Sequence, residues 1–584
     1  MSRNQAIRGL TIRWQDGMTE EIAAAVSGEF PVGTTSGEAL DALGVSRSGL
    51  AAVYVNNEIR SLAAPLVVNA VLKPVSLASH EGRVVYRSSL AFLLGAAAAQ
   101  VFPNRRLIVG HSLGNGYYYH FADGKPAGTD NAGGPNGMDG LARLKETMTE
   151  LVKADCAISF YYIAHEEAVV LFQEKGQPDT VALLEERIAA NVPVYACNGW
   201  VDLAIGALVP RTGILSVFDI FPYEDGFLLR YPTSSSGGIG PDGVFAPDVP
   251  FGPFEDIPKL FAVYREYKQW GRIVGLHSAG KLNRLTAAGD IEDFIRIAEA
   301  FHAKKLADAA DKIYDLRGDA RIVLIAGPSS SGKTTTAKRI AVQLRVLGME
   351  PLAISLDDYY NPPHLAPKDE DGNPDLECLE ALDVPYLNEQ LERLLEGDEI
   401  TLPVFDFKTC TRREGKKVRA GRRTVIVIEG IHGLNDKLTE MIPARAKFKL
   451  YVSPLTQLNL DDHNRVPTSD NRLIRRLVRD HQFRGTSASG TLSMWPSVRR
   501  GELRHIFPYQ NSADFIFNSA LDYELAVLKF YAEPLLHTVK PREAAFAEAS
   551  RLLGFLDRFT PILPQIVPLE SILREFIGGS GFKY

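Results

Sequence analysis

The chain has 584 residues, of which 45% are hydrophobic and 23% are charged, and its formal net charge is −7. A single hydrophobic core rarely grows beyond about 300 residues, so this length excludes one domain and favours about three in an ordinary globular protein. The acidic balance argues against a chain that mainly coats nucleic acid.

Residues 1–77 are predicted to form a small mixed sheet of β-grasp size. Ile7–Trp14 and Leu50–Val55 have the short apolar pattern of strands, and Asn56-Asn57 supplies the turn after the second of them. Ser36–Leu43 is expected to be a short helix, and Leu66–Val71 a strand that closes the sheet.

Residues 78–286 mix helical and strand-like patterns, which favours an α+β domain. Ser88–Val101 and Met138–Lys153 are predicted helices, and Ile214–Phe221 is a predicted strand. Glycine and proline crowd the stretch Ser234–Pro253, which we interpret as surface loops.

Residues 287–584 alternate strands and helices, which predicts an α/β fold with a parallel sheet and flanking helices. Ile291–Leu316 is rich in helix formers and is expected to lead into this domain. Short apolar runs typical of strands buried on both faces are Arg321–Ile325, Leu352–Leu356, Thr424–Ile428, Phe448–Val452 and Asp514–Phe517. Helices are expected at Lys333–Leu347, Val384–Leu395 and Asn471–Arg479, and the last segment, Leu521–Tyr584, is expected to be helical with proline interruptions.

The segment from Gly327 to Thr334 reads GPSSSGKT and matches the phosphate-binding motif GxxxxGK[ST]. It lies between a predicted buried strand and a predicted amphipathic helix, which is the context that the motif requires. Glycines let backbone N–H groups wrap a phosphate, and the helix N-terminus adds its positive end. Lys333 is expected to bridge the β- and γ-phosphates of ATP, and the Thr334 hydroxyl to bind Mg²⁺. The predicted nucleotide-binding residues are Gly327, Pro328, Ser329, Ser330, Ser331, Gly332, Lys333, Thr334 and Thr335.

Acidic residues follow two further predicted strands. Asp357 comes directly after the run Ile354-Ser355-Leu356, where a carboxylate can accept the proton of a hydroxyl that attacks the γ-phosphate; a turn cap is the alternative. Glu429 ends the strand Val425–Ile428, and an acid there resembles the residue that holds Mg²⁺ directly or through water; a simple turn residue is the alternative.

Arginines recur on one predicted helix. Arg472, Arg475, Arg476 and Arg479 follow one another at short helical spacing, and Arg484 comes soon after. Guanidinium groups that face a transferring phosphoryl group would neutralise its charge, whereas the alternative is a solvated helix face. We expect Arg475 and Arg479 to act in catalysis and Arg476 and Arg484 to bind substrate.

Five motifs together resemble one enzyme family. GPSSSGKTT, Ser355–Tyr360, Pro403–Phe407, Val427–Ile431 and Arg472–Asp480 occur in the order and spacing of the uridine/cytidine kinase and phosphoribulokinase family, over about residues 318–520. The resemblance implies that Asp357 is the catalytic base toward a ribose 5′-hydroxyl. It also implies that Tyr360 and Asp406 lie near a bound nucleoside.

The chain departs from that family where the base is read. A tyrosine and a histidine of uridine kinases fall on Phe405 and Cys410, and the ribose-binding aspartate falls on Glu377. The carboxylate is kept, but a hydrogen-bonding pair that discriminates bases is lost. Pyrimidine specificity is therefore open.

The first half resembles another family. Phe30–Thr35 and Ala51–Glu58 are similar to the TGS domain of threonyl-tRNA synthetases, and the stretches from Leu107 and from Val201 are similar to the editing domain of those enzymes. The HxxxH and CxxxH residues of the editing domain fall on Ser88, Phe92, Ala204 and Leu208, so we predict that this domain has no working metal site. The predicted domains are a TGS-like domain at 1–77, a degenerate editing-like domain at 78–286, and a P-loop nucleoside kinase domain at 287–584.

These observations predict an ATP-dependent nucleoside kinase with ATP and Mg²⁺ as cofactors. The alternatives are a kinase of a phosphosugar or another hydroxylated metabolite, and an ATP-sensing regulator that binds RNA or tRNA. Cys156, Cys197, Cys378 and Cys410 show no paired spacing, and no apolar leader or long apolar run is present, so we expect a cytoplasmic protein without a membrane partner. We do not expect a nucleic acid partner, but binding through the N-terminal domains is left open, as is oligomerisation.

Overall fold

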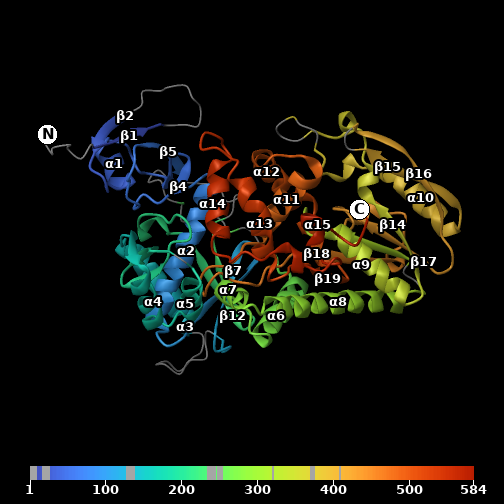
Figure 1. Ribbon diagram of the computed structural model, residues 1–584, viewed down its shortest axis with the longest axis horizontal. Coiled ribbons are helices and arrows are strands. Elements are labelled where there is room, and N and C mark those ends of the chain that lie inside the picture. The colour runs from blue at the N-terminus through green and yellow to red at the C-terminus, as the bar shows by residue number, and fades with distance from the viewer. Residues whose placement is uncertain are drawn as a thin grey trace.

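The computed structural model describes residues 9–15, 26–126, 139–187, 189–232, 245, 251, 254–318, 321–368, 372, 375–406 and 409–583. Figure 1 shows the N-terminal strands at one end of the long axis and helix α9 (Lys333–Val346) toward the other end.

The first sheet has the strand order β2-β1-β5-β3-β4. Its strands are β1 Leu10–Trp14, β2 Val26–Phe30, β3 Leu50–Val55, β4 Glu58–Arg60 and β5 Ala70–Ser76. Helix α1 (Ser36–Ala42) is opened by a capping box between Thr35 and Glu38. Asn56 and Asn57 have φ values of 50° and 68°, the pair of positive angles that a tight hairpin needs. The strand expected at Leu66–Val71 begins later, at Ala70, and β5 lies between β1 and β3 in the sheet. Leu66 is buried in the same core but precedes the strand. Residues 7 and 8 of the first expected strand lie outside the described residues.

The second region places two sheets around a central helix. The sheet orders are β10-β9-β8 and β11-β12-β7-β6. Their strands are β6 Leu107–Leu113, β7 Gly116–Phe121, β8 Ser159–Ala164, β9 Asn191–Cys197, β10 Trp200–Leu203, β11 Asp219–Tyr223 and β12 Gly226–Arg230, and the helices are α2 His80–Val101, α3 Asp139–Ala154, α4 His165–Glu174 and α5 Pro178–Glu185. Within the described ranges α2 alone is long and apolar enough to cross a membrane, and 61% of its most apolar window is buried inside the protein. It packs in the core of this region, against α3 and β10.

The strand expected at Ile214–Phe221 has the wrong start. The structure has a short 3-10 helix at Thr212–Ile214, and β11 starts only at Asp219. The Thr212 hydroxyl donates to the carbonyl oxygen of Leu151 at 2.6 Å, which fixes this turn against α3. The loops expected at Ser234–Pro253 lie almost wholly outside the described residues.

Three helices join the two halves: α6 Pro258–Ile273, α7 Ala279–Ala288 and α8 Ile291–Asp315. In addition, Arg106 from the N-terminal half donates to Asp462 at 2.7 Å, and the amide of Val109 donates to the carbonyl oxygen of Asp462 at 2.8 Å. The halves are therefore fixed to each other by polar contacts as well as by helix packing.

The C-terminal half contains a five-stranded parallel sheet of order β14-β17-β13-β18-β19. Its strands are β13 Ile322–Ala326, β14 Glu350–Ser355, β17 Thr424–Glu429, β18 Lys447–Ser453 and β19 Phe515–Asn518, with α9 Lys333–Val346 and α10 Val384–Glu396 between them. Alternate residues of β13 enter different cores: Val323 and Ile325 lie on one face, and Ile322 and Leu324 on the other. The sheet is thus buried on both faces, as the unbroken apolar runs predict.

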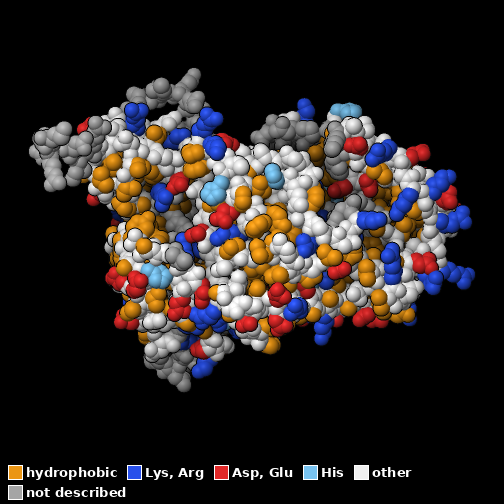
Figure 2. Space-filling model, viewed as in Figure 1, with side chains coloured by type: hydrophobic (Ala, Val, Ile, Leu, Met, Phe, Trp, Pro, Cys, Tyr) orange, Lys and Arg blue, Asp and Glu red, His pale blue; other side chains and the backbone are white. Residues whose placement is uncertain are grey.

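The remaining helices and a hairpin surround this sheet. They are α11 Thr468–Arg484, α12 Ala488–His505, α13 Glu524–Leu536, α14 Phe546–Leu556, α15 Arg574–Ile577, and the antiparallel pair β15 Glu399–Asp406 and β16 Thr411–Arg419. Short 3-10 helices lie at Leu356–Tyr359, Pro363–Leu365, Leu379–Ala381, Asp436–Thr439, Ala444–Ala446, Phe507–Ser512 and Pro564–Ile566. The hairpin forms the far end of the molecule, where Figure 2 shows many lysine and arginine side chains, and the chain ends beside α9 (Figure 1).

Candidate active site

The loop between β13 and α9 has the backbone shape of a phosphate-binding loop. Gly332, the residue before α9, has φ of 87°, and Ser330 has φ of 59°. A Cβ at Gly327 would lie 2.0 Å from the carbonyl oxygen of Val452, so β18 leaves room only for glycine there. We call residues 327–335 the phosphate cradle.

Lys333 lies over this cradle. Its ammonium group donates to the carbonyl oxygen of Pro328 at 3.2 Å. Desolvation lowers the pKa of Lys333, while the nearby carboxylates of Glu429 and Asp357 act in the opposite direction. The lysine therefore faces the two acidic residues that the sequence singled out.

Glu429 joins the cradle to the strand beside it. It accepts hydrogen bonds from the Ser355 hydroxyl at 3.0 Å and from the Thr334 hydroxyl at 3.4 Å. Desolvation, followed by the charge of Asp357, raises the pKa of Glu429 to about 7. A desolvated carboxylate beside two hydroxyls offers oxygen ligands that suit Mg²⁺. Proteins usually supply only a few of the ligands of this ion, and water and phosphate oxygens supply the rest. In the part of the chain that the structure describes, no group of three histidine, cysteine, aspartate or glutamate side chains could hold a metal by itself.

Asp357 and Asp358 have different surroundings although they are adjacent. Asp357 is exposed, and its charge acts on both Lys333 and Glu429. Asp358 is half-buried and accepts the backbone N–H of Phe405 at 3.1 Å, and desolvation raises its pKa. Strand β17 lies between β14 and β13, so Asp357 reaches Lys333 across the carboxyl end of one intervening strand.

Aromatic and acidic side chains gather next to Asp357. The Tyr360 hydroxyl donates to the carbonyl oxygen of Leu376 at 3.0 Å, and its ring lies 6.1 Å from that of Phe405. Desolvation raises the pKa of Glu377, and the charges of Arg476 and Lys333 oppose that rise. Glu377 therefore lies near the lysine, and Tyr360 lies near Asp357, Glu377 and the ring of Phe405.

Asp406 is the last residue of β15, and Cys410 lies in the turn of the β15–β16 hairpin. Asp406 accepts the backbone N–H of Thr409 at 3.3 Å, and Cys410 has φ of 53°. These contacts stabilise the turn. The structure therefore gives both residues a position at the hairpin tip, beyond Phe405.

Three of the predicted arginines surround one buried acid. Arg476, Arg479 and Arg484 lie within 3.2, 2.7 and 3.7 Å of Asp480, whose side chain is 2% exposed. Arg476 also donates to the Ser329 hydroxyl at 2.7 Å, which brings it onto the cradle. The sequence motif contained Asp480, but its role as the common partner was not predicted.

Arg475 lies beneath the cradle rather than on the side of the acidic residues. Its side chain is fully buried; it donates to Glu524 at 2.6 Å and to the carbonyl oxygens of Ser519 at 2.8 Å and Ser330 at 3.3 Å. The expectation that this arginine faces a transferring phosphoryl group is corrected, because its donors are taken by internal partners.

Arg472 has a similar structural position. It donates to the carbonyl oxygen of Ser329 at 2.9 Å and forms a buried ion pair with Glu502. Glu502 in turn accepts the backbone N–H of Ser329 at 3.1 Å and pairs with Arg499 at 2.8 Å. Glu502 could not be predicted, since it lies 173 residues from its partner and belongs to no motif.

Of the four positions aligned with the editing-domain motifs, two are buried, and Ser88 is exposed. Phe92 and Leu208 are buried in the apolar core of the second region.

A glycine-bearing loop between a buried parallel strand and a helix, a lysine over that loop, and carboxylates at the ends of two other strands define the nucleotide site of a P-loop kinase domain. Residues 322–526 match the model of the phosphoribulokinase/uridine kinase family. This part of the chain is an ATP-dependent kinase domain.

Curated relatives match a different part. The threonine–tRNA ligase of Syntrophotalea carbinolica is 30% identical over 195 residues, which are 33% of this chain and 29% of the ligase. The threonine–tRNA ligase of Acetivibrio thermocellus is 26% identical over 195 residues, which are again 33% of this chain and 29% of the ligase. These matches cover the N-terminal part, and the chain spans less than a third of each ligase.

Solved structures of two other proteins align with part of the chain. A possible uridine kinase from Bacillus stearothermophilus aligns over 36% of this chain and 99% of its own, with 22% identity and a TM-score of 0.21. A D-glycerate 3-kinase from Cryptococcus neoformans aligns over 46% of this chain and 87% of its own, with 16% identity and a TM-score of 0.20.

Proposed function

We propose that the chain is a nucleoside kinase that transfers the γ-phosphate of ATP to the 5′-hydroxyl of a nucleoside. The observation that carries this proposal is the group formed by Asp357, Lys333 and Glu377 beside the rings of Tyr360 and Phe405. Carboxylates suit the hydroxyls of an uncharged sugar, and aromatic rings suit a flat base.

A phosphosugar acceptor fits this surface less well. Besides Arg476 and Lys333, the carboxylates of Asp375 and Asp357 act on Glu377, so three acidic side chains lie on this side of the site. A second phosphate would have to be desolvated beside these like charges, which is unfavourable.

In the proposed reaction Asp357 accepts the proton of the 5′-hydroxyl, whose oxygen forms a bond to the γ-phosphorus while the bond to the β,γ-bridging oxygen of ATP breaks. ADP carries away the released electron pair. Lys333 and the arginines around Asp480 neutralise charge on the transferred group. Thr334 and Glu429 would hold Mg²⁺, which supplies further neutralisation of the phosphates when it is bound.

A panel of acceptors with labelled ATP tests this proposal. We expect turnover of at least one nucleoside, and little or none of free sugars and phosphosugars. If only a phosphosugar were phosphorylated, the acceptor would be a phosphosugar and not a nucleoside. The panel has to include purine as well as pyrimidine nucleosides, because Phe405 and Cys410 stand where related kinases have the two residues that read the base.

The 195-residue match to threonine–tRNA ligases supports a second candidate, a regulator that binds tRNA through residues 1–286 and senses ATP. This candidate predicts salt-dependent tRNA binding with a Kd that changes when ATP is added. Turnover of a nucleoside, without measurable tRNA binding, would exclude it.

A further inference from the structure

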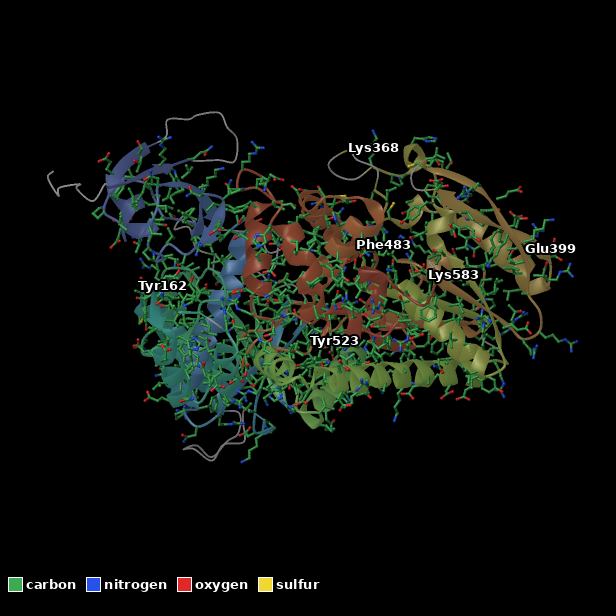
Figure 3. The ribbon with its side chains drawn as sticks, viewed as in Figure 1. Tyr162, Lys368, Glu399, Phe483, Tyr523 and Lys583 are labelled. Carbon is green, nitrogen blue, oxygen red and sulfur yellow. The ribbon has the colours of Figure 1, made fainter. Side chains whose placement is uncertain are left out.

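The last residues of the chain pack onto the phosphate cradle, although they lie outside the matched family region of 322–526. We call residues 564–583 the C-terminal segment. A Cβ at Gly332 would lie 2.4 Å from Cδ1 of Ile572, and the ring of Phe576 lies 4.9 Å from the guanidinium of Arg475. Lys338 on α9 donates to the carbonyl oxygen of Lys583, and Figures 1 and 3 show this end of the chain beside α9.

One side chain of the C-terminal segment enters the cradle itself. Glu575 accepts hydrogen bonds from the backbone N–H of Thr335 at 3.0 Å and from the Thr335 hydroxyl at 2.5 Å. Thr335 is the third residue of α9, so its N–H is one of the amides at the helix start that have no partner within the helix. A carboxylate therefore occupies a position where a helix N-terminus binds anions.

The charge of Glu575 also reaches the rest of the site. It acts on the ammonium of Lys333 and on the carboxyl of Glu429. A nucleotide phosphate that approached Thr335 would be repelled by the negative charge of Glu575. The N–H and the hydroxyl of Thr335 already donate to that carboxylate.

Glu575 differs from the second acid that contacts the cradle. Glu502 is fully buried between Arg472 and Arg499, so it is a fixed part of the loop. Glu575 is half-buried on α15, which has only four residues, and its hydrogen bonds in the described structure both go to Thr335. Movement of α15 would release the Thr335 amide without breaking a buried ion pair.

We propose that Glu575 is an internal anion that occupies the nucleotide-phosphate position at Thr335 and is displaced when ATP binds. The C-terminal segment then belongs to the nucleotide site and sets its affinity. This inference rests on the proposed function, because it requires that the cradle binds ATP.

Nucleotide affinity of the full chain tests the inference. Kd values for ADP and for Mg·ATP are measured by calorimetry for the wild type, Glu575→Gln and the matched control Glu570→Gln, which removes the same charge from an exposed position in the same segment. Since a neutral amide is a weaker competitor than a carboxylate, we expect Glu575→Gln to bind ADP about tenfold more tightly and Glu570→Gln to match the wild type.

Each result has a distinct meaning. Binding by Glu575→Gln that is unchanged or weaker overturns the inference and leaves the kinase proposal intact. An absence of nucleotide binding in all three proteins overturns both.

A second measurement needs no variant and so does not depend on the folding of one. Amide exchange in residues 564–583 of the wild type is compared with and without saturating ADP. We expect faster exchange in this segment when ADP is bound, because α15 has to leave the cradle. Exchange that stays the same or slows would contradict the displacement.

Discussion

Adjacent aspartates at the end of β14 differ in what they contact. Asp357 is exposed near Lys333, whereas Asp358 holds the amide of Phe405. We expect Asp357→Asn to lower kcat by about 10²–10⁴-fold, because the amide has the same shape but accepts no proton, and to change the Kd for ATP less than about threefold. Steady-state kinetics with the best acceptor and calorimetry with ATP check both parts.

Asp358→Asn is the matched control for this change. It weakens the contact with the β15–β16 hairpin, so we expect a lower melting temperature and a kcat within about tenfold of the wild type. A kcat that falls more for Asp358→Asn than for Asp357→Asn would reverse the assignment.

Glu429 has the surroundings of a magnesium ligand, since it bonds the hydroxyls of Thr334 and Ser355 and is desolvated. Glu429→Gln keeps the size of the side chain but removes its charge. We expect the Mg²⁺ concentration for half-maximal activity to rise by about tenfold or more. A magnesium titration at saturating ATP measures this, and an unchanged midpoint would exclude Glu429 as a ligand or as a partner of the bound water.

At the scale of elements, α12 and α11 are joined to the phosphate cradle by one buried acid. Glu502 on α12 faces two arginines and the Ser329 amide, and its side chain is fully buried. Glu502→Gln leaves two guanidinium groups without a counter-charge, so we expect the free energy of unfolding to fall by roughly 3–5 kcal/mol. Urea denaturation measures the loss. Glu548→Gln removes one partner of the more exposed Arg551 pair, and we expect it to cost less than half as much.

The sequence predicted the parallel sheet well and the surrounding elements less well. The strands around Ile322 and Ile426 are short and apolar on both faces, a pattern that few other structures produce. The strand β16 reads TRREGKKVR and has no apolar alternation, so the hairpin was not predicted. Helix α12 contains Pro496 in its interior, and a proline in a sequence usually indicates that a helix ends, so this helix was not predicted either.

Contacts between distant segments explain what the sequence could not show at the site. Lys333, Thr334, Asp357 and Glu429 follow strands of one sheet, so motif and topology together place them. Glu575 is 240 residues from Thr335, and no local pattern distinguishes it from other acids of the C-terminal segment. Arg475 was misplaced for the same reason, because its partner Glu524 comes from α13.

At the scale of the whole molecule, charged groups lie where the two halves meet. His463 of the C-terminal half lies 2.9 Å from Asp202 on β10, and Arg106 contacts both Asp179 and Asp462. Burial by itself lowers the pKa of His463, but the carboxylate of Asp202 raises it to about 9. The imidazolium is thus charged at neutral pH and joins the halves as an ion pair.

The stability of this junction depends on pH in a definite direction. The pKa of His463 is higher in the folded chain than the ordinary value of 6.5, so its contribution is complete below about pH 6.5 and is lost as the pH rises through about 9. Burial raises the pKa of Asp461 to about 7, which also makes the folded state less favourable as the pH rises. We expect the unfolding free energy to fall by on the order of 2 kcal/mol between pH 6.5 and pH 9. In His463→Gln the value at pH 6.5 should be lower and the fall should be smaller, as measured by denaturation at both pH values. An equal fall in the variant and the wild type would show that other groups, and not the pair across the junction, carry the pH dependence.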